Sequence, residues 1–124
     1  MTIMKIRLEV ARAPEFPSGS HLHGYEFVAP LDDKGNISVE EWKTHKEECR
    51  VQRFWGSQEH EVGHLVRKPG GAWAFHYDIH GDSDDDDTGY RFGAHPFVPG
   101  EYVSIKDHDD DELHTFKVIT IQPI

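Results

Sequence analysis

Two histidines four residues apart, with a glutamate beside the first, make the stretch His60-Glu61-Val62-Gly63-His64 a candidate metal site. On a helix, residues four apart share a face, so both imidazoles could bind one zinc ion while the glutamate activates a water molecule. On a β-strand the same four steps, at about 3.3 Å each, separate the two histidines by roughly 13 Å. No single ion spans that distance, so the secondary structure of this stretch decides whether it is a metal site.

The neighbouring residues favour a strand or loop over a helix. A helix carrying both histidines would begin near Ser57, include Gly63 at a cost of about 1 kcal/mol, and end before Pro69. It would have fewer than about three turns. We therefore predict that His60 and His64 lie outside any helix.

Over about ten residues, the sequence around His60 resembles the zinc metallohydrolases. The resemblance implies that His60 and His64 bind Zn²⁺ and that Glu61 is the catalytic base. The remainder of the chain reads as strands with one early helix, which departs from the helical scaffold of those enzymes. The zinc site is therefore the alternative hypothesis.

A second pattern, His76-Tyr77-Asp78-Ile79-His80, alternates polar and apolar residues. In a strand the two histidines and the aspartate share one face, which is a workable arrangement for a metal. Polar positions of an antiparallel strand usually face water, so we interpret this face as the solvated one.

Acidic residues crowd two short segments, 82–87 and 107–112. Alternate acidic residues, as in a calcium-binding loop, occur at Asp82, Asp84 and Asp86. Asp87 stands where an EF-hand requires glycine, and Gly93 stands where its bidentate glutamate belongs, so the first segment is not an EF-hand. Mutual repulsion of the carboxylates favours a solvated, mobile loop.

Alternation and turn residues predict a single domain, residues 1–124, that is mainly β. Strands are expected at 4–10, 22–29, 49–55, 64–68, 72–79, 90–97, 101–106 and 113–122. Ser38 and Glu41 form a capping box that begins one α-helix, Val39 to Glu48. These elements predict an antiparallel β-barrel or sandwich of about eight strands. The expected core includes Trp73, Phe75, Tyr77, Ile79, Val103, Ile105, Phe116 and Val118.

An antiparallel meander would bring both acidic segments and the histidine motif to one end of the sheet. That rim would contain His60, Glu61, His80, Asp82 to Asp87, His108 and Asp109 to Asp111. Crowded carboxylates attract cations, so we expect weak binding of Ca²⁺ or another divalent cation and no required cofactor. The candidate ligands are Asp82, Asp84, Asp86, Asp109, Asp111, His80 and His108.

The net charge of -10 comes almost wholly from the second half of the chain. Residues 71–124 hold three Lys and Arg against twelve Asp and Glu, whereas residues 1–70 hold ten against eleven. Such a surface repels phosphate backbones, so nucleic acid is not an expected partner. The chain has neither the apolar run of a signal peptide nor that of a membrane span, which predicts a cytoplasmic protein with no membrane partner. The single cysteine, Cys49, is expected to be a buried apolar residue.

The segment Gly71 to Ile105 resembles a group of small uncharacterised bacterial proteins. The resemblance lies in Trp73-Ala74-Phe75-His76-Tyr77-Asp78 and in residues 95–105, His-Pro-Phe-Val-Pro-Gly-Glu-Tyr-Val-Ser-Ile. The resemblance implies a bacterial cytoplasmic origin and carries no activity. Since no nucleophile motif or phosphate loop is present, we expect a non-enzymatic binding or interaction module for a protein or small ligand. The alternative is a metal-dependent hydrolase, or another metalloenzyme, that uses rim histidines and carboxylates.

Overall fold

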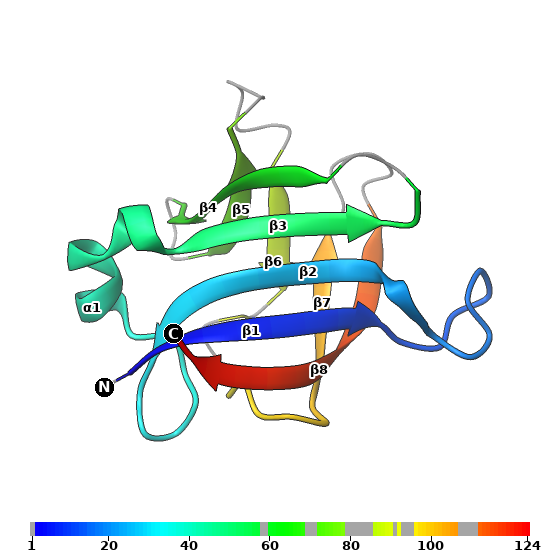
Figure 1. The fold of residues 1–124 in the computed structure, drawn as a ribbon, viewed down its shortest axis with the longest axis horizontal. Helices are drawn as coiled ribbons and strands as arrows, with labels where there is room; N and C mark the ends of the chain where they lie inside the picture. Colours follow the sequence, from blue (N-terminus) through cyan, green and yellow to red (C-terminus); the bar gives the residue numbers. More distant parts are fainter. Residues whose placement is uncertain are drawn as a thin grey trace.

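The computed structural model describes residues 2–57, 60–68, 72–78, 86–90, 92, 96–106 and 112–124. Each strand pairs antiparallel with the next, and the last pairs with the first, so the sheet closes into a barrel (Figure 1). Its strands are β1 (Thr2–Val10), β2 (Ser20–Leu31), β3 (Arg50–Trp55), β4 (Glu61–Arg67), β5 (Trp73–Tyr77), β6 (Asp87–Tyr90), β7 (Tyr102–Lys106) and β8 (Leu113–Pro123). The predicted antiparallel barrel with one α-helix is confirmed. No helix in the described residues is long and apolar enough to cross a membrane.

The closing pair of strands joins residues that are far apart in the sequence. Met4 lies opposite Pro123, and Val10 lies opposite Phe116. The register shifts by one residue between Arg7 and Leu8, which leaves Ile119 as an extra residue of β8. Such a bulge bends a strand, and Figure 1 shows β8 turning from the direction of β7 to that of β1.

Alternate residues of each strand point into the barrel and form its core. Directly opposed residues such as Phe27 and Val51, or Leu65 and Phe75, are buried together because antiparallel partners share a face. Every predicted core residue among those described is buried. Ile79 lies outside the described residues.

Aromatic side chains close the barrel end nearest the helix. The α-helix α1 (Val39–Thr44) presents Trp42, whose indole meets the Trp73 ring edge to face at 5.2 Å between centroids. The indole N–H also donates to the carbonyl of Leu65 at 3.0 Å. Phe92 and Phe97 are fully buried beside Phe27, so this end is filled with rings.

The predicted helix was too long. The α-helix ends at Thr44 because the backbone of His45 leaves the helical region, and a short 3₁₀ turn, η1 (Lys46–Glu48), follows. After this turn the buried Cys49 directly precedes β3, and its carbonyl accepts from the amide of Leu65 in β4 at 2.8 Å.

The sixth strand begins and ends earlier than the aromatic alternation of residues 90–97 indicated. It covers Asp87–Tyr90, and Phe92 folds back over Gly89. A Cβ atom at this glycine would lie 2.4 Å from the Phe92 ring, so only glycine leaves room for it. The ring thus closes the barrel end instead of continuing a strand.

The strand directions define an opposite end, which we call the acidic end. There β3 ends at Trp55, β4 begins at Glu61, β5 ends at Tyr77 and β6 begins at Asp87. Because successive strands run in opposite directions, β7 also ends and β8 also begins at this end, as expected for an antiparallel meander. The link from β1 to β2 also projects there, at the right of Figure 1.

Candidate functional site

The histidine motif lies in and just before a strand. His60 precedes β4, and both Glu61 and His64 belong to it, so the prediction that the motif is not helical is confirmed. Glu61 lies opposite Arg53 on the interior face, whereas His64 lies opposite Arg50 on the outer face. The carboxylate and the second imidazole therefore point to opposite sides of the sheet, which is not the arrangement of a zinc hydrolase.

Two histidines face each other on the outer surface of β4 and β5, each held by a carboxylate. His64 lies opposite His76, and its Nδ1 is 3.1 Å from Asp78 Oδ1. The Nδ1 of His76 is 2.7 Å from Asp86 Oδ1, and the ammonium of Lys68 is 3.1 Å from the other oxygen of that carboxylate. Across the described part of the chain, no three His, Cys, Asp or Glu side chains are grouped so as to hold a metal ion.

Most of the candidate ligands of the acidic rim lie outside the described residues, namely His80, Asp82, Asp84, His108, Asp109 and Asp111. The last two residues of the first acidic segment, Asp86 and Asp87, are buried. The expectation of a solvated loop is therefore wrong for these two. Asp86 is held by a histidine and a lysine on the outer face, and Asp87 begins β6 and points inward beside Phe75.

A buried polar layer crosses the interior of the barrel near the acidic end. The hydroxyls of Tyr25 and Tyr77 both donate to Asp87 Oδ2, at 2.7 and 2.6 Å. The guanidinium of Arg53 lies 3.7 Å from the same oxygen and donates to Glu61 Oε1 at 3.3 Å. The sequence predicted Tyr77 as a core residue, but it contains no local sign that Tyr77, Tyr25 and Arg53 meet at one carboxylate.

Burial raises the pKa of Tyr77 well above its ordinary value of 10.0, and the neighbouring Tyr25 and Asp87 raise it further. The folded protein thus keeps this phenol protonated at pH values where the unfolded chain ionises. Above about pH 10 the unfolded state is favoured by this difference, and stability falls by up to about 1.4 kcal/mol per pH unit.

We therefore expect the free energy of unfolding to decrease as the pH rises above 10. Tyr77→Phe should make this decrease less steep by up to about 1.4 kcal/mol per pH unit, because one ionising group is removed. Below pH 9 it should leave the pH dependence of the free energy of unfolding unchanged. Urea titrations between pH 8 and 11, for the natural protein and the variant, measure the two slopes. If the natural protein and the variant show equal slopes above pH 10, the Tyr77 phenol ionises as readily in the folded state as in the unfolded state.

The lone thiol is not arranged as a nucleophile. Cys49 is fully buried, and burial, followed by the charge of Glu48, raises its pKa to about 11. At neutral pH the side chain is a protonated, inaccessible thiol. The prediction that Cys49 is a buried apolar residue is confirmed.

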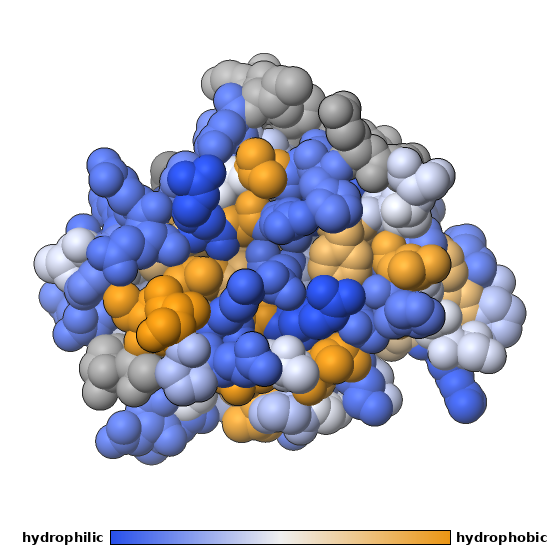
Figure 2. Space-filling view, in the orientation of Figure 1, coloured by the Kyte–Doolittle hydropathy of each residue, from blue (hydrophilic) through white to orange (hydrophobic). Residues whose placement is uncertain are grey.

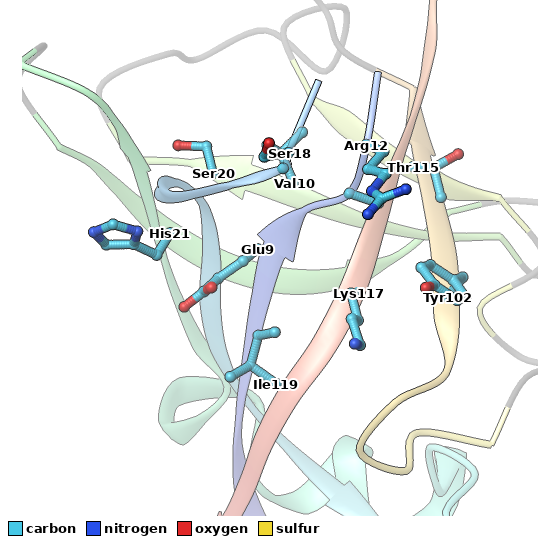
Figure 3. Close-up of a pocket in the computed structure, with 12 residues that line it drawn as sticks. Glu9, Val10, Arg12, Ser18, Ser20, His21, Tyr102, Thr115, Lys117 and Ile119 are labelled. Carbon is cyan, nitrogen blue, oxygen red and sulfur yellow. The ribbon is translucent and has the colours of Figure 1, made fainter. Parts of the chain in front are cut away.

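A groove with a volume of about 690 Å³ lies on the outer face of the barrel, between the β1–β2 link and the strands β1, β8 and β7 (Figure 3). The link is held in shape by two hydrogen bonds between Ala13 and Phe16, and the Phe16 ring packs against His23 at 4.5 Å. The groove is lined by Glu9, Val10, Ala11, Arg12, Ser18, Gly19, Ser20, His21, Tyr102, Thr115, Lys117 and Ile119.

The groove is cationic although the protein is strongly acidic. The carboxylate of Glu9 accepts from Arg7 Nε at 2.8 Å, and the same guanidinium donates to Glu26 at 3.4 Å. Lys5 also pairs with Glu26 at 3.2 Å, so these two carboxylates are balanced by two cations. Arg12 and Lys117 are exposed, and among the described residues neither has an ion-pair or hydrogen-bond partner. Figure 3 shows both on the same side of the groove, with Thr115 and Tyr102.

Sequence reasoning missed this groove because its residues come from four strands, β1, β2, β7 and β8, and from the link between the first two. Closure of the barrel places β8 beside β1, so that Lys117 lies opposite Glu9 on one side and Tyr102 on the other. The only signal in the sequence was the low net charge of the first half, where Arg7 and Arg12 balance the nearby Glu9 and Glu15. A search of protein-family models, of curated proteins and of solved structures found no match to this chain.

Proposed function

We propose that this protein is a non-enzymatic binding module that holds a small anionic ligand in the groove of Figure 3. The observation that carries the proposal is a pair of exposed cations, Arg12 and Lys117, at the wall of a groove of about 690 Å³, neither of which pairs with any residue that the structure describes. Ligand pockets of about 300–1,000 Å³ with a few polar groups accommodate molecules of metabolite size. A guanidinium and an ammonium are the donors that proteins use for phosphate and carboxylate.

The negative charge of the rest of the protein surface favours anion binding at one selective site over a general attraction for anions. The net charge is -10, so an anion is repelled by most of the surface and attracted only where cations gather. Figure 2 shows small apolar patches separated by hydrophilic side chains on the face of β1, β2 and β3. Recognition on such a surface depends on charged and polar contacts.

Binding is favoured over catalysis by the placement of the reactive side chains. The thiol of Cys49 is buried and protonated, and Glu61 points to the interior, where it accepts from Arg53. Asp87 accepts from two tyrosines and is fully buried. These groups stabilise the barrel, whereas the groove residues remain accessible to a ligand.

Inorganic phosphate is the simplest probe of the groove. Two charge-assisted hydrogen bonds of about 2 kcal/mol each predict a Kd on the order of 1 mM. In an NMR titration at constant ionic strength, phosphate should shift the backbone amide signals of residues 9–12 and 115–119. All these shifts should saturate with the same dissociation constant. Lys117→Gln should weaken this binding about tenfold or more, because it removes one of the two charged donors.

The matched control is Lys43→Gln, which removes the same charge from the exposed surface of α1. It should leave the phosphate Kd unchanged. If chloride shifts the same signals equally, or if both glutamine variants weaken phosphate alike, the groove is not an anion site.

A further inference from the structure

We infer that the anion bound in the groove is a phosphate monoester attached to a flat ring, an inference that rests on the proposed function. The groove holds about 690 Å³, which is many times the volume of a phosphate ion. A bare anion between Arg12 and Lys117 would leave most of this space to water. The remaining wall therefore determines what the rest of the ligand is.

An exposed aromatic ring stands next to the cationic side of the groove. Tyr102 is 55% exposed, unlike the buried tyrosines of the interior. It lies directly opposite Lys117 on the neighbouring strand, which places the two Cβ atoms about 5 Å apart. A ligand ring stacked on Tyr102 and a ligand anion bound by Lys117 are therefore close enough to belong to one small molecule.

The covalent geometry of an aryl phosphate fits this spacing. Its ring and its phosphorus are joined through a single oxygen atom, so a ring on Tyr102 keeps the phosphate beside Lys117. Aromatic pairs prefer offset or edge-to-face contact, which an exposed phenol on a strand allows.

The charge of the site selects a dianion. Arg12 and Lys117, which have no ion-pair partner among the described residues, match the charge of about -1.5 to -2 that a phosphate monoester carries at pH 7, while Glu9 is paired with Arg7. Thr115 lines the same side of the groove (Figure 3). The hydroxyl of Ser20 is engaged with His23 Nδ1 at 2.7 Å and does not contribute.

Phenyl phosphate, inorganic phosphate and phenol, titrated separately into the full chain at pH 7.5, test the inference. Amide shifts and the Tyr102 ring signals give the three dissociation constants. Stacking predicts that phenyl phosphate binds about fivefold more tightly than inorganic phosphate, and that phenol binds far more weakly than either. Tyr102→Leu should reduce the ratio of the first two constants to about one, while Lys117→Gln should weaken both.

The outcomes separate this inference from the function on which it rests. Equal affinities for phenyl phosphate and inorganic phosphate, both reduced by Lys117→Gln, would contradict the inference that the ligand carries a ring. They would still support an anion site in the groove. An unchanged ratio in Tyr102→Leu would also overturn the ring contact. If neither phosphate binds, or if Lys117→Gln weakens neither, the anion site and the inference both fail. A thermal midpoint within about 2 °C of the natural protein confirms that each variant is folded.

Discussion

Asp87→Ala is expected to lower the free energy of unfolding by about 3–5 kcal/mol, because it removes one partner of a buried ion pair. The carboxylate is fully buried and lies 3.7 Å from Arg53, whose side chain is itself only 6% exposed. Without it, the guanidinium loses its fully buried counter-charge, and the hydroxyls of Tyr25 and Tyr77 lose their acceptor. Urea unfolding followed by circular dichroism measures the loss.

Asp87→Asn separates the charge from the hydrogen bonds. The amide oxygen of asparagine still accepts from both tyrosines, so this variant should lose clearly less stability than alanine. Tyr77→Phe, which removes one hydroxyl donor, should cost only about 1–2 kcal/mol. If Asp87→Ala costs no more than Tyr77→Phe, the ion pair with Arg53 does not contribute to the stability of the barrel.

Trp73→Ala should destabilise the protein by about 3–5 kcal/mol, the cost of emptying a large, fully enclosed site. The indole is 1% exposed, packs against Trp42 and has the guanidinium of Arg67 5.1 Å above its ring. Its removal leaves a cavity between the barrel wall and α1, which the surrounding strands cannot close. A thermal denaturation curve should show the midpoint falling by at least about 10 °C.

Leu22→Ala is the matched control for this substitution. Leu22 is apolar but 57% exposed, so its truncation should change the free energy of unfolding by no more than about 0.5 kcal/mol. Equal effects of the two substitutions would contradict the packing of Trp73 against the helix.

The barrel could be predicted because each strand is marked by a pattern of apolar and polar residues within its own short segment. Alternation in residues 4–10 and 72–79 marks which side chains face inward, and one-residue errors would reverse that assignment. The sixth strand was misplaced because Tyr90 and Phe92 stand two residues apart, as side chains on one face of a strand do. The rings of Phe92 and Phe97 fill the end of the barrel, a tertiary role that no local pattern distinguishes from strand pairing.

The candidate site could not be predicted in the same way. The histidine motif was correctly assigned to a non-helical segment, since Gly63 and Pro69 disfavour a helix. The cations of the groove, Arg12 and Lys117, are more than 100 residues apart in the sequence. They share a surface only because β8 pairs with β1, and a single sequence contains no signal for that pairing.

The pairing of β1 with β8 also constrains how the protein is made. Residues 4–10 leave the ribosome before the other strands of the barrel, yet the strand that completes their pairing, 116–123, is the last of the eight to be synthesised. Until then β1 has one unpaired edge whose N–H and C=O groups can pair with another chain. The nascent protein therefore depends on late, long-range closure, a slow class of folding step during which it is exposed to aggregation. Synthesis that stalls before residue 113 would release a chain with two open edges, one on β1 and one on β7.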